Sequence, residues 1–353
     1  MLTIIIPTKN RSDFLIRLLN YLADTHYRYF INIGDSSNVF HAGRIRETIK
    51  KLGNRLHLAY YECPDLTGPK CLVKLVQMVS TPYVSYIGDD DFLVPNSVEK
   101  CVKFLEMNPE HVACHGVGAI ISFNQDSQHV QFKNVYDYRL RSREERVASE
   151  RLINHLSNNS NVLFSVYRTE VLKKMFDNNV IIDVSFGYDL LPACLAVIMG
   201  KIKKINCFHI IHHTHSAQIK YSKDIYDWLA SPNWFPSYQM FYKILSDELV
   251  KKDAISLDEA QLIVKRAFWS YLNYKLNSHF RSCYGTSGNS FSIKQKIKRI
   301  PGIKGMWNIV KNIQYKIRPS NHITLPALLN PSSPYHADFM PIYRAITNPQ
   351  QES

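Results

Sequence analysis

The sequence predicts an α/β fold in which a mostly parallel sheet is flanked by helices, followed by a C-terminal helical extension. Over roughly the first 220 residues, short apolar runs alternate with segments whose apolar residues recur every three or four positions. This alternation is typical of repeated β-α-β units. The first run, residues 2–7, is apolar as expected of a parallel strand that is buried on both faces.

The later elements follow from the same two patterns. Apolar runs predict further strands at residues 30–33, 56–61, 83–87, 112–121 and 161–167. Helical spacing of apolar residues predicts helices between them. The apolar faces of these helices are Phe14, Leu15, Leu18, Leu19 and Leu22, then Leu72, Leu75, Val76 and Val79, then Val98, Cys101, Val102 and Leu105.

Three regions are expected along the chain. Residues 1–222 form the α/β domain, and residues 223–283 are predicted to be helical and rich in aromatic side chains. Residues 284–353 begin with a polar linker, continue with basic amphipathic helices and end in an irregular tail. Within this last region, residues 291–318 contain eight Lys or Arg and no acidic residue. Such helices suit an anionic membrane surface, and they equally suit packing on the rest of the chain or on a second subunit.

Composition limits the function classes. The chain carries 43 Lys and Arg against 30 Asp and Glu, a formal charge of +13, which favours anionic partners such as phosphorylated substrates, membrane surfaces or nucleic acid. Its seven cysteines are scattered, as expected of reduced thiols. No apolar run approaches the roughly 18 residues of a membrane span, and no secretory signal pattern is present. We therefore expect a cytoplasmic protein, peripheral at most on the inner face of a membrane.

Three consecutive carboxylates follow one of the predicted strands, at the sheet edge where a doubly wound fold binds its ligands. The strand at residues 83–87 is followed by Gly88, Asp89, Asp90 and Asp91. Adjacent carboxylates repel one another, and a cation that neutralises them removes this cost. Such oxygen ligands suit Mg²⁺ or Mn²⁺, which commonly bridge to substrate phosphates. The alternative is a solvated acidic turn that caps the following segment.

Three segments resemble the family 2 glycosyltransferases of GT-A fold, of the type that builds bacterial surface glycans. They are TIIIPTKNR at residues 3–11, INIGDSS at residues 31–37 and YVSYIGDDDFLVPNSVEKCVKFLEMNP at residues 83–109. The resemblance covers about residues 1–220 and depends on the order of the three segments. It implies that residues 1–222 bind a nucleotide sugar, commonly a UDP-sugar, and transfer its sugar with inversion at the anomeric carbon.

The resemblance also implies roles for individual residues. Mn²⁺ or Mg²⁺ would be held by Asp90, Asp91 and His215, because Gly88 stands where the family often has its first Asp. Asp35 would accept a hydrogen bond from the nucleotide's base. The residues implied at the nucleotide sugar are Pro7, Thr8, Asn10, Arg11, Asp35, Ser36, Lys70, Asp89 and Asp90.

A general base is expected farther along the chain. Residues 183–218 resemble the family's segment that carries this base, and Asp189 matches it, with Tyr188 where Glu is common. An inverting enzyme needs such a carboxylate beside the acceptor hydroxyl to take its proton. Because Asp189 begins a predicted helix, the helix dipole should keep it ionised.

Three histidines, His212, His213 and His215, end the last predicted strand of the domain. Alternate residues of a strand point to the same side, so His213 and His215 can face the site together. The resemblance favours His215 as the residue that completes the metal or diphosphate shell. A surface or packing role for the cluster is the alternative.

Two other function classes stay open at this point. A sugar-phosphate nucleotidyltransferase also uses paired carboxylates and Mg²⁺, although it usually begins with a glycine-rich loop, which residues 7–12 are not. A nucleic-acid-binding protein would explain the charge, yet the strand ends are acidic, so we expect no nucleic-acid partner. The expected acceptor is a glycan or a lipid-linked sugar, and a homo-oligomer is compatible with the sequence.

Overall fold

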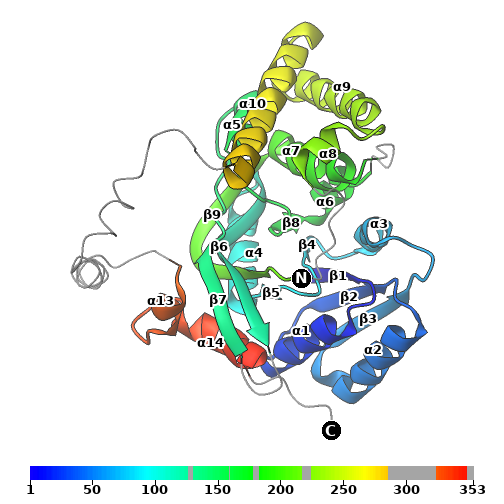
Figure 1. Ribbon diagram of the computed structural model, residues 1–353, viewed down its shortest axis with the longest axis vertical. Coiled ribbons are helices and arrows are strands. Elements are labelled where there is room, and N and C mark those ends of the chain that lie inside the picture. The colour runs from blue at the N-terminus through cyan, green and yellow to red at the C-terminus, as the bar shows by residue number, and fades with distance from the viewer. Residues whose placement is uncertain (126–129, 159, 178–182, 217–223, 285–322, 348–353) are drawn as a thin grey trace.

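The computed structural model describes residues 1–125, 130–158, 160–177, 183–216, 224–284 and 323–347. These residues form one sheet with helices packed against it and a group of helices at one end (Figure 1). The basic segment 291–318, with its predicted membrane or protein contact, lies outside the described residues. Among the helices that the structure describes, none has both the length and the apolar character needed to cross a membrane.

The sheet is mixed, with the strand order β3-β2-β1-β4-β8-β6-β9-β5 and with β7 paired to β6. β3, β2, β1 and β4 are mutually parallel, as are β6 and β9, and the remaining pairs are antiparallel. The first four strands form the parallel half that the sequence predicts. The strands are β1 (Leu2–Thr8), β2 (Phe30–Asp35), β3 (His57–Glu62), β4 (Tyr83–Tyr86), β5 (Phe92–Leu93), β6 (His111–Gln125), β7 (Val130–Asp137), β8 (Val166–Arg168) and β9 (Lys201–His213).

Two buried apolar clusters cover the two faces of this sheet. Along β1, Ile4 and Ile6 belong to the cluster that includes α1, α2 and α4. Ile5 belongs to the cluster on the other face, which includes α3, α5, α6 and α7. All three isoleucines are fully buried, which explains why β1 is an apolar run rather than an alternating pattern. The helices of this part are α1 (Ser12–Asp24), α2 (Val39–Leu52), α3 (Gly68–Met78), α4 (Pro95–Met107), α5 (Ala148–Ser157), α6 (Thr169–Met175) and α7 (Leu191–Met199).

Residues 224–284 are helical, as the sequence predicts, and they pack on a single π-helical turn, η2 (Ser185–Leu190). Phe186 of this turn is fully buried among their aromatic rings, with centroid distances of 4.9 Å to Trp228, 5.3 Å to Phe241 and 5.7 Å to Phe268. The aromatic cluster therefore fixes the segment that also carries Asp189. The helices are α8 (Ile225–Leu229), α9 (Trp234–Asp253) and α10 (Leu257–Tyr284).

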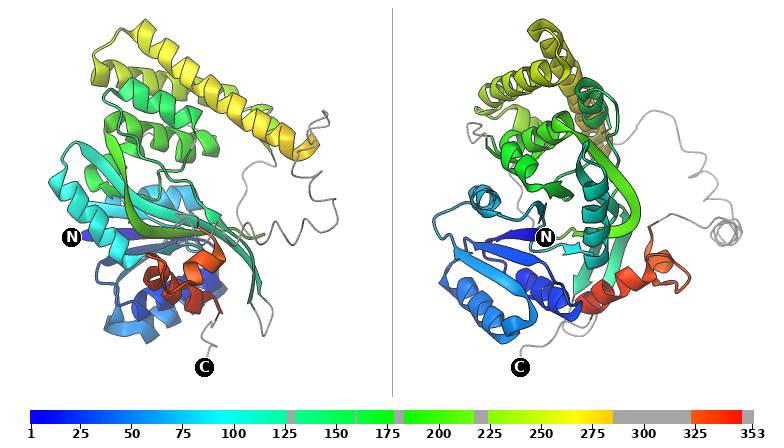
Figure 2. Two further views of the ribbon diagram at one scale, coloured as in Figure 1. Left: turned by 90° about the vertical axis from the view of Figure 1, so that its left-hand side faces the viewer. Right: turned by 180° about the vertical axis from the view of Figure 1, so that it is seen from behind.

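The end of the chain differs from the irregular tail that the sequence predicts. It contains α13 (Leu325–Leu329) and α14 (His336–Thr347), and α14 lies beside α1 (Figure 2). This segment is thus part of the domain core rather than an appendage. Its buried side chains are Ile323, Leu328, Tyr335, Phe339, Ile342 and Ile346.

Candidate active site

The candidate active site is a cleft of about 410 Å³ at the carboxyl ends of β1 and β4, the sheet edge at which the sequence predicts a ligand. Segments that are far apart in the sequence form its walls. Among the predicted site residues, those that line it are Pro7, Thr8, Arg11, Asp89, Asp90, Asp91 and Asp189. It is also lined by residues to which the sequence analysis assigned no role, among them Lys9, Tyr86, Asn161, Leu163 and Phe164.

Asp89 is buried beside the cleft and is held by the last residue of β1, Thr8, and by Arg11, which follows the strand. Thr8 Oγ1 donates a hydrogen bond of 2.7 Å to Asp89 Oδ2, and the Arg11 guanidinium forms an ion pair with the same carboxylate. Burial raises the pKa of Asp89 to about 6, and the charge of Arg11 opposes this shift. Thr8 and Arg11 therefore position an acidic residue of the cleft.

The other two carboxylates are held by the end of β9 and by the residues after it. Asp90 Oδ2 accepts a hydrogen bond of 2.8 Å from His215 Nε2 and lies 2.7 Å from Arg11 Nη2. Asp91 Oδ1 accepts hydrogen bonds from His212 Nδ1 at 2.9 Å and from the backbone N–H of His213 at 3.0 Å. Side chains thus offset the repulsion within the triplet.

These partners lower the pKa values of both carboxylates, but the net shifts have opposite directions because burial opposes the partners to different extents. Burial acts to raise the pKa of Asp90, but the hydrogen bond from His215 and the charge of Arg11 outweigh it, so the pKa is lowered. For Asp91 burial prevails and raises the pKa, although the hydrogen bond from His212 opposes it. Asp90 is therefore the member of this pair whose charged form the protein favours.

The three histidines divide between the two sides of the chain, as strand alternation predicts. The ring centroids of His213 and His215 lie 4.8 Å apart, whereas His212 lines the cleft. His215 stacks on Phe14 with centroids 4.4 Å apart, and His213 stacks on Phe123 at 4.3 Å. Burial lowers the pKa of His213 to about 3, so this ring is neutral. His212 thus joins the site through Asp91, a role to which the sequence analysis did not assign it.

Arg17 of α1 supports the triplet from outside the cleft, and the sequence analysis did not identify it. Its guanidinium donates a hydrogen bond of 3.4 Å to the backbone carbonyl of Asp90. It lies 5.3, 5.1 and 5.7 Å from the ring centroids of Phe14, Phe92 and Phe123. Burial among these rings lowers the pKa of Arg17 to about 10, while the nearby carboxylates oppose the shift.

The donor set fits a divalent cation in part. Within the described residues, no group of three or more His, Cys, Asp and Glu side chains is arranged to hold a metal ion. Two of the predicted ligands are nevertheless adjacent, since Asp90 Oδ2 and His215 Nε2 lie 2.8 Å apart. Both oxygens of Asp91 accept hydrogen bonds from His212. The carboxylates have the chemistry that Mg²⁺ and Mn²⁺ prefer, and the metal role stays a prediction.

Gly88 precedes the triplet where the family often has an Asp, and the structure explains this difference. A Cβ added to Gly88 would lie 2.6 Å from Asp90 Oδ1 and 3.2 Å from Asp91 Oδ2. Real Cβ atoms do not approach other atoms as closely as 2.6 Å, so any side chain here would displace the Asp90 carboxylate. The glycine therefore leaves Asp90 in contact with Arg11 and His215.

We expect Gly88→Ala to fold and to lose transfer activity by roughly a hundredfold, because a displacement of about 1 Å at a reacting site costs about that much. Turnover of a sugar nucleotide and the thermal midpoint would be measured side by side. Gly43→Ala on α2 is the matched control, because a Cβ there meets nothing within 4 Å. Wild-type turnover by Gly88→Ala would show that the position of Asp90 does not matter.

Part of the cleft wall is a turn where the sequence predicts the start of a strand. β8 begins only at Val166, and the Leu163 N–H donates a hydrogen bond of 2.8 Å to Asn161 Oδ1. The turn places Asn161, Leu163 and Phe164 at the cleft, where Phe164 stacks on Tyr86 with centroids 5.2 Å apart.

Four residues predicted at the nucleotide sugar do not line the cleft: Asn10, Asp35, Ser36 and Lys70. Asp35 is buried, and its oxygens accept hydrogen bonds of 2.7 Å from the Tyr60 hydroxyl and 2.8 Å from the Ser37 N–H. Asn10 is exposed in the loop after β1, and Lys70 is exposed in the first turn of α3. Contact of these four with a base or diphosphate therefore stays a prediction.

Asp189 lies in η2, before the first residue of α7, and is exposed within the cleft. The sequence predicts that a helix dipole keeps it ionised. In the structure the surrounding protein desolvates the carboxylate and raises its pKa, and the charge of Lys275 on α10 opposes this shift. Burial, and then the charges of Asp91 and Asp189 together, raise the pKa of both Tyr86 and Tyr138. The charge of the predicted base and that of Asp91 in the triplet therefore act on the same two tyrosines.

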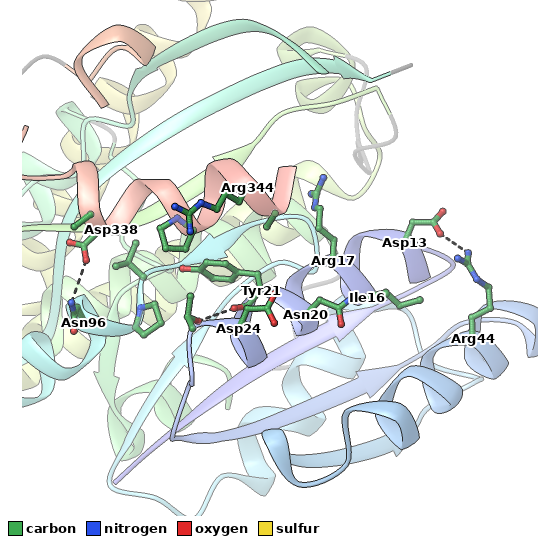
Figure 3. A pocket seen from close by; sticks show the side chains of 16 residues that line it. Asp13, Ile16, Arg17, Asn20, Tyr21, Asp24, Arg44, Asn96, Asp338 and Arg344 are labelled. Atoms are coloured by element: carbon green, nitrogen blue, oxygen red, sulfur yellow. Dashed lines mark hydrogen bonds and ion pairs between the residues drawn. The ribbon is translucent and has the colours of Figure 1, made fainter. Parts of the chain in front are cut away.

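A larger cavity of about 670 Å³ lies between α1 and α14 (Figure 3). Its acidic side chains are already partnered: Asp13 pairs with Arg44 at 2.5 Å, and Asp338 accepts a hydrogen bond of 3.4 Å from Asn96. This cavity does not combine the carboxylates of the triplet with a candidate base. Its size therefore does not make it the active site.

Comparison with known proteins agrees with this geometry. The family model described as Glycosyl transferase family 2 matches residues 3–176. A search of curated proteins finds no match. Among solved structures, Staphylococcus aureus TarS 1–349 in complex with UDP-GlcNAc has a TM-score of 0.54 and 14% identity, covering 80% of this chain and 76% of that chain. TarS 1–349 in complex with UDP has a TM-score of 0.48 and 16% identity, covering 84% and 76%.

The first of these likenesses supports the GT-A fold that the sequence predicts. The matched residues contain the elements from β1 to α6, and with them Thr8, Arg11 and the acidic triplet. Asp189, the histidines and the C-terminal helices lie beyond the match. The match also decides against the nucleotidyltransferase and the nucleic-acid-binding protein as alternatives. The chain belongs to glycosyl transferase family 2 and is a glycosyltransferase.

Proposed function

We propose that this protein is an inverting enzyme that transfers a sugar from a UDP-sugar to a hydroxyl of a glycan or lipid-linked acceptor. One observation carries the proposal: a single cleft is lined by the acidic triplet, by Thr8 and Arg11, and by the isolated carboxylate of Asp189. A carboxylate that is separate from the donor-binding acids is what an inverting transfer needs. The likeness to S. aureus TarS 1–349 in complex with UDP-GlcNAc supports UDP as the nucleotide of the donor.

The residues have distinct roles in this proposal. Asp189 accepts the proton of the acceptor hydroxyl while the hydroxyl oxygen bonds to the anomeric carbon and the bond to the diphosphate breaks. Arg11 and Lys9 supply positive charge at the cleft. A divalent cation, when bound, supplies charge neutralisation for the departing diphosphate, and Asp90, Asp91 and His215 are the residues that would hold it.

A donor screen tests this proposal. The purified protein would be incubated with UDP, GDP, dTDP and their sugars, with Mn²⁺ or with EDTA, and its thermal midpoint recorded. We expect UDP and a UDP-sugar to raise the midpoint in the presence of Mn²⁺, because a ligand that binds only the folded state stabilises it. Slow release of UDP from the sugar nucleotide should accompany binding. Stabilisation by another nucleotide alone would contradict the UDP assignment.

A further inference from the structure

Another cavity, of about 530 Å³, adjoins the cleft and is lined by none of the residues that the proposed function assigns to the donor. Asn161, Leu163 and Asp189 line both, so the predicted base stands at the border between them. The rest of its lining comes from α5, α7, α8 and α10 and from the segments around β6. Most of these elements lie outside the residues that match the family model. The C-terminal helices therefore build much of this cavity.

Aromatic and polar side chains share the walls of this cavity. Trp228 and Tyr271 are buried and line it. The Trp228 indole is held in place because its Nε1–H donates a hydrogen bond of 3.1 Å to Asp183 Oδ1. Ser160 and Ser185 add hydroxyl groups. Aromatic faces with a few convergent polar groups are typical of small-molecule sites, and a sugar ring offers both apolar C–H faces and hydroxyls to such walls.

Lys275 of α10 is the only Lys or Arg among the described residues that line this cavity. The side chain is half-buried, and its ammonium lies 5.5 Å from the ring centroid of Tyr271. The part of the chain that the structure describes provides it with no hydrogen bond and no ion pair within 4 Å. Burial lowers the pKa of Lys275, and the charge of Asp189 opposes this shift. A desolvated ammonium of this kind costs free energy unless an anion binds to it.

Apart from Lys275 and the predicted base Asp189, the acidic and basic groups that line the cavity are engaged elsewhere or neutral. Asp224 Oδ1 caps α8 by accepting hydrogen bonds from the N–H groups of Tyr226 at 2.8 Å and Asp227 at 3.0 Å. Burial lowers the pKa of His155 to about 3, so its ring carries no charge. Lys275 is thus the group that is available to an incoming anion.

We propose that this cavity is the acceptor site and that it binds a saccharide with an anionic substituent, a phosphate or a carboxylate, paired with Lys275. The sugar ring lies against Trp228 and Tyr271, and a hydroxyl of the same acceptor reaches Asp189. The inference rests on the proposed function, because it takes Asp189 as the base. The excess of 43 basic over 30 acidic side chains agrees with it, since a charge of +13 attracts an anionic glycan over long range.

Binding of defined saccharides tests the inference. Matched oligosaccharides that are neutral, carboxylated or phosphorylated would be offered to the protein in the presence of UDP and a UDP-sugar, and transfer to each would be followed. We expect transfer to acidic saccharides and a rise in their KM of tenfold or more in Lys275→Met, because a charge-assisted hydrogen bond is lost. Lys275→Arg should keep most of the affinity. The carboxylated and phosphorylated arms show which anion is preferred.

The possible outcomes separate this inference from the proposed function. If Lys275 only tuned Asp189, Lys275→Met would change kcat and its pH profile for neutral and acidic acceptors alike and leave KM unchanged. That result, or wild-type transfer to neutral saccharides only, would overturn the anion site and leave the transferase intact. Calorimetry of UDP binding to Lys275→Met checks that the fold is kept. Failure of the wild-type protein to bind or turn over any UDP-sugar would instead contradict the proposed function itself.

Discussion

Asp90→Asn is expected to lower turnover at least a hundredfold while the protein stays folded. Asn keeps the size of the side chain but removes the charge that contacts Arg11 at 2.7 Å and His215 at 2.8 Å. Neutralising the leaving diphosphate supplies several kcal/mol of transition-state stabilisation, and about 2.7 kcal/mol corresponds to a hundredfold in rate. The Mn²⁺-dependent part of the thermal stabilisation by UDP should disappear in the same variant. Asp91→Asn should also lose turnover and the Mn²⁺-dependent stabilisation by UDP.

The matched control for these variants is Asp13→Asn, an exposed carboxylate on α1 that pairs with Arg44 at 2.5 Å. It removes one negative charge from the same face of the domain without touching the cleft, so its turnover should stay close to that of the wild type. Mn²⁺-dependent UDP binding of wild-type strength in both Asp90→Asn and Asp91→Asn would show that the metal does not bind at the triplet.

Asp189→Asn is expected to lose transfer by a factor on the order of 10² to 10⁴ and to bind the sugar nucleotide as the wild type does. Removal of a positioned general base has an effect of this size, because Asn cannot accept the proton of the acceptor hydroxyl. Donor binding should survive, since no hydrogen bond or ion pair joins Asp189 to the triplet in the part of the chain that the structure describes. Calorimetry with UDP beside an activity assay measures the two properties separately.

The pH profile gives a second readout for Asp189. The surrounding protein raises the pKa of this carboxylate, so protonation removes the base at a higher pH than for an ordinary Asp. The wild-type rate should therefore fall as the pH falls through that raised pKa, and the residual rate of Asp189→Asn should lack this dependence. Asp183→Asn is the control from the same segment, because Asp183 accepts hydrogen bonds from Phe186 N–H and Trp228 Nε1, which an Asn oxygen can also accept. Near-normal transfer by Asp189→Asn would remove it from the mechanism.

The parallel half of the sheet could be predicted because each of its strands is a short run rich in apolar or aromatic residues, which is a local feature of the sequence. The spacing of apolar residues does not predict α2, because Val39 and Phe40 at its start are 84% and 67% exposed and only Ala42, Ile45 and Leu52 are buried. In α14 the apolar spacing is present, but Pro341 within the helix and the neighbouring prolines favour an irregular segment. Tertiary packing against α1 and the sheet outweighs this local preference.

The acidic triplet, Thr8 and Arg11 could be identified from the sequence because they lie at strand ends, and strand ends are local features. The resemblance also pointed to His215 and Asp189. In the structure, His215 forms a hydrogen bond with Asp90, and Asp189 lines the same cleft as the triplet. What no local pattern encodes is the pairing of residues that are far apart in the chain. A role for Asp35, Lys70 and the basic segment 291–318 in ligand binding stays a prediction.

By itself, the sequence determined the fold class, the family and the chemistry at one edge of the sheet. Periodicity records which residues are buried, and short motifs record which groups follow a strand. Only the tertiary structure decided that Arg17 supports Asp90, that His212 bonds to Asp91, and that Lys275 and the predicted base Asp189 line one cavity. These contacts join residues separated by tens to more than a hundred positions, and they depend on how β9 returns beside β6 and how the C-terminal helices pack on η2. A pattern along the chain contains no information about such distances, because they are set by packing between elements.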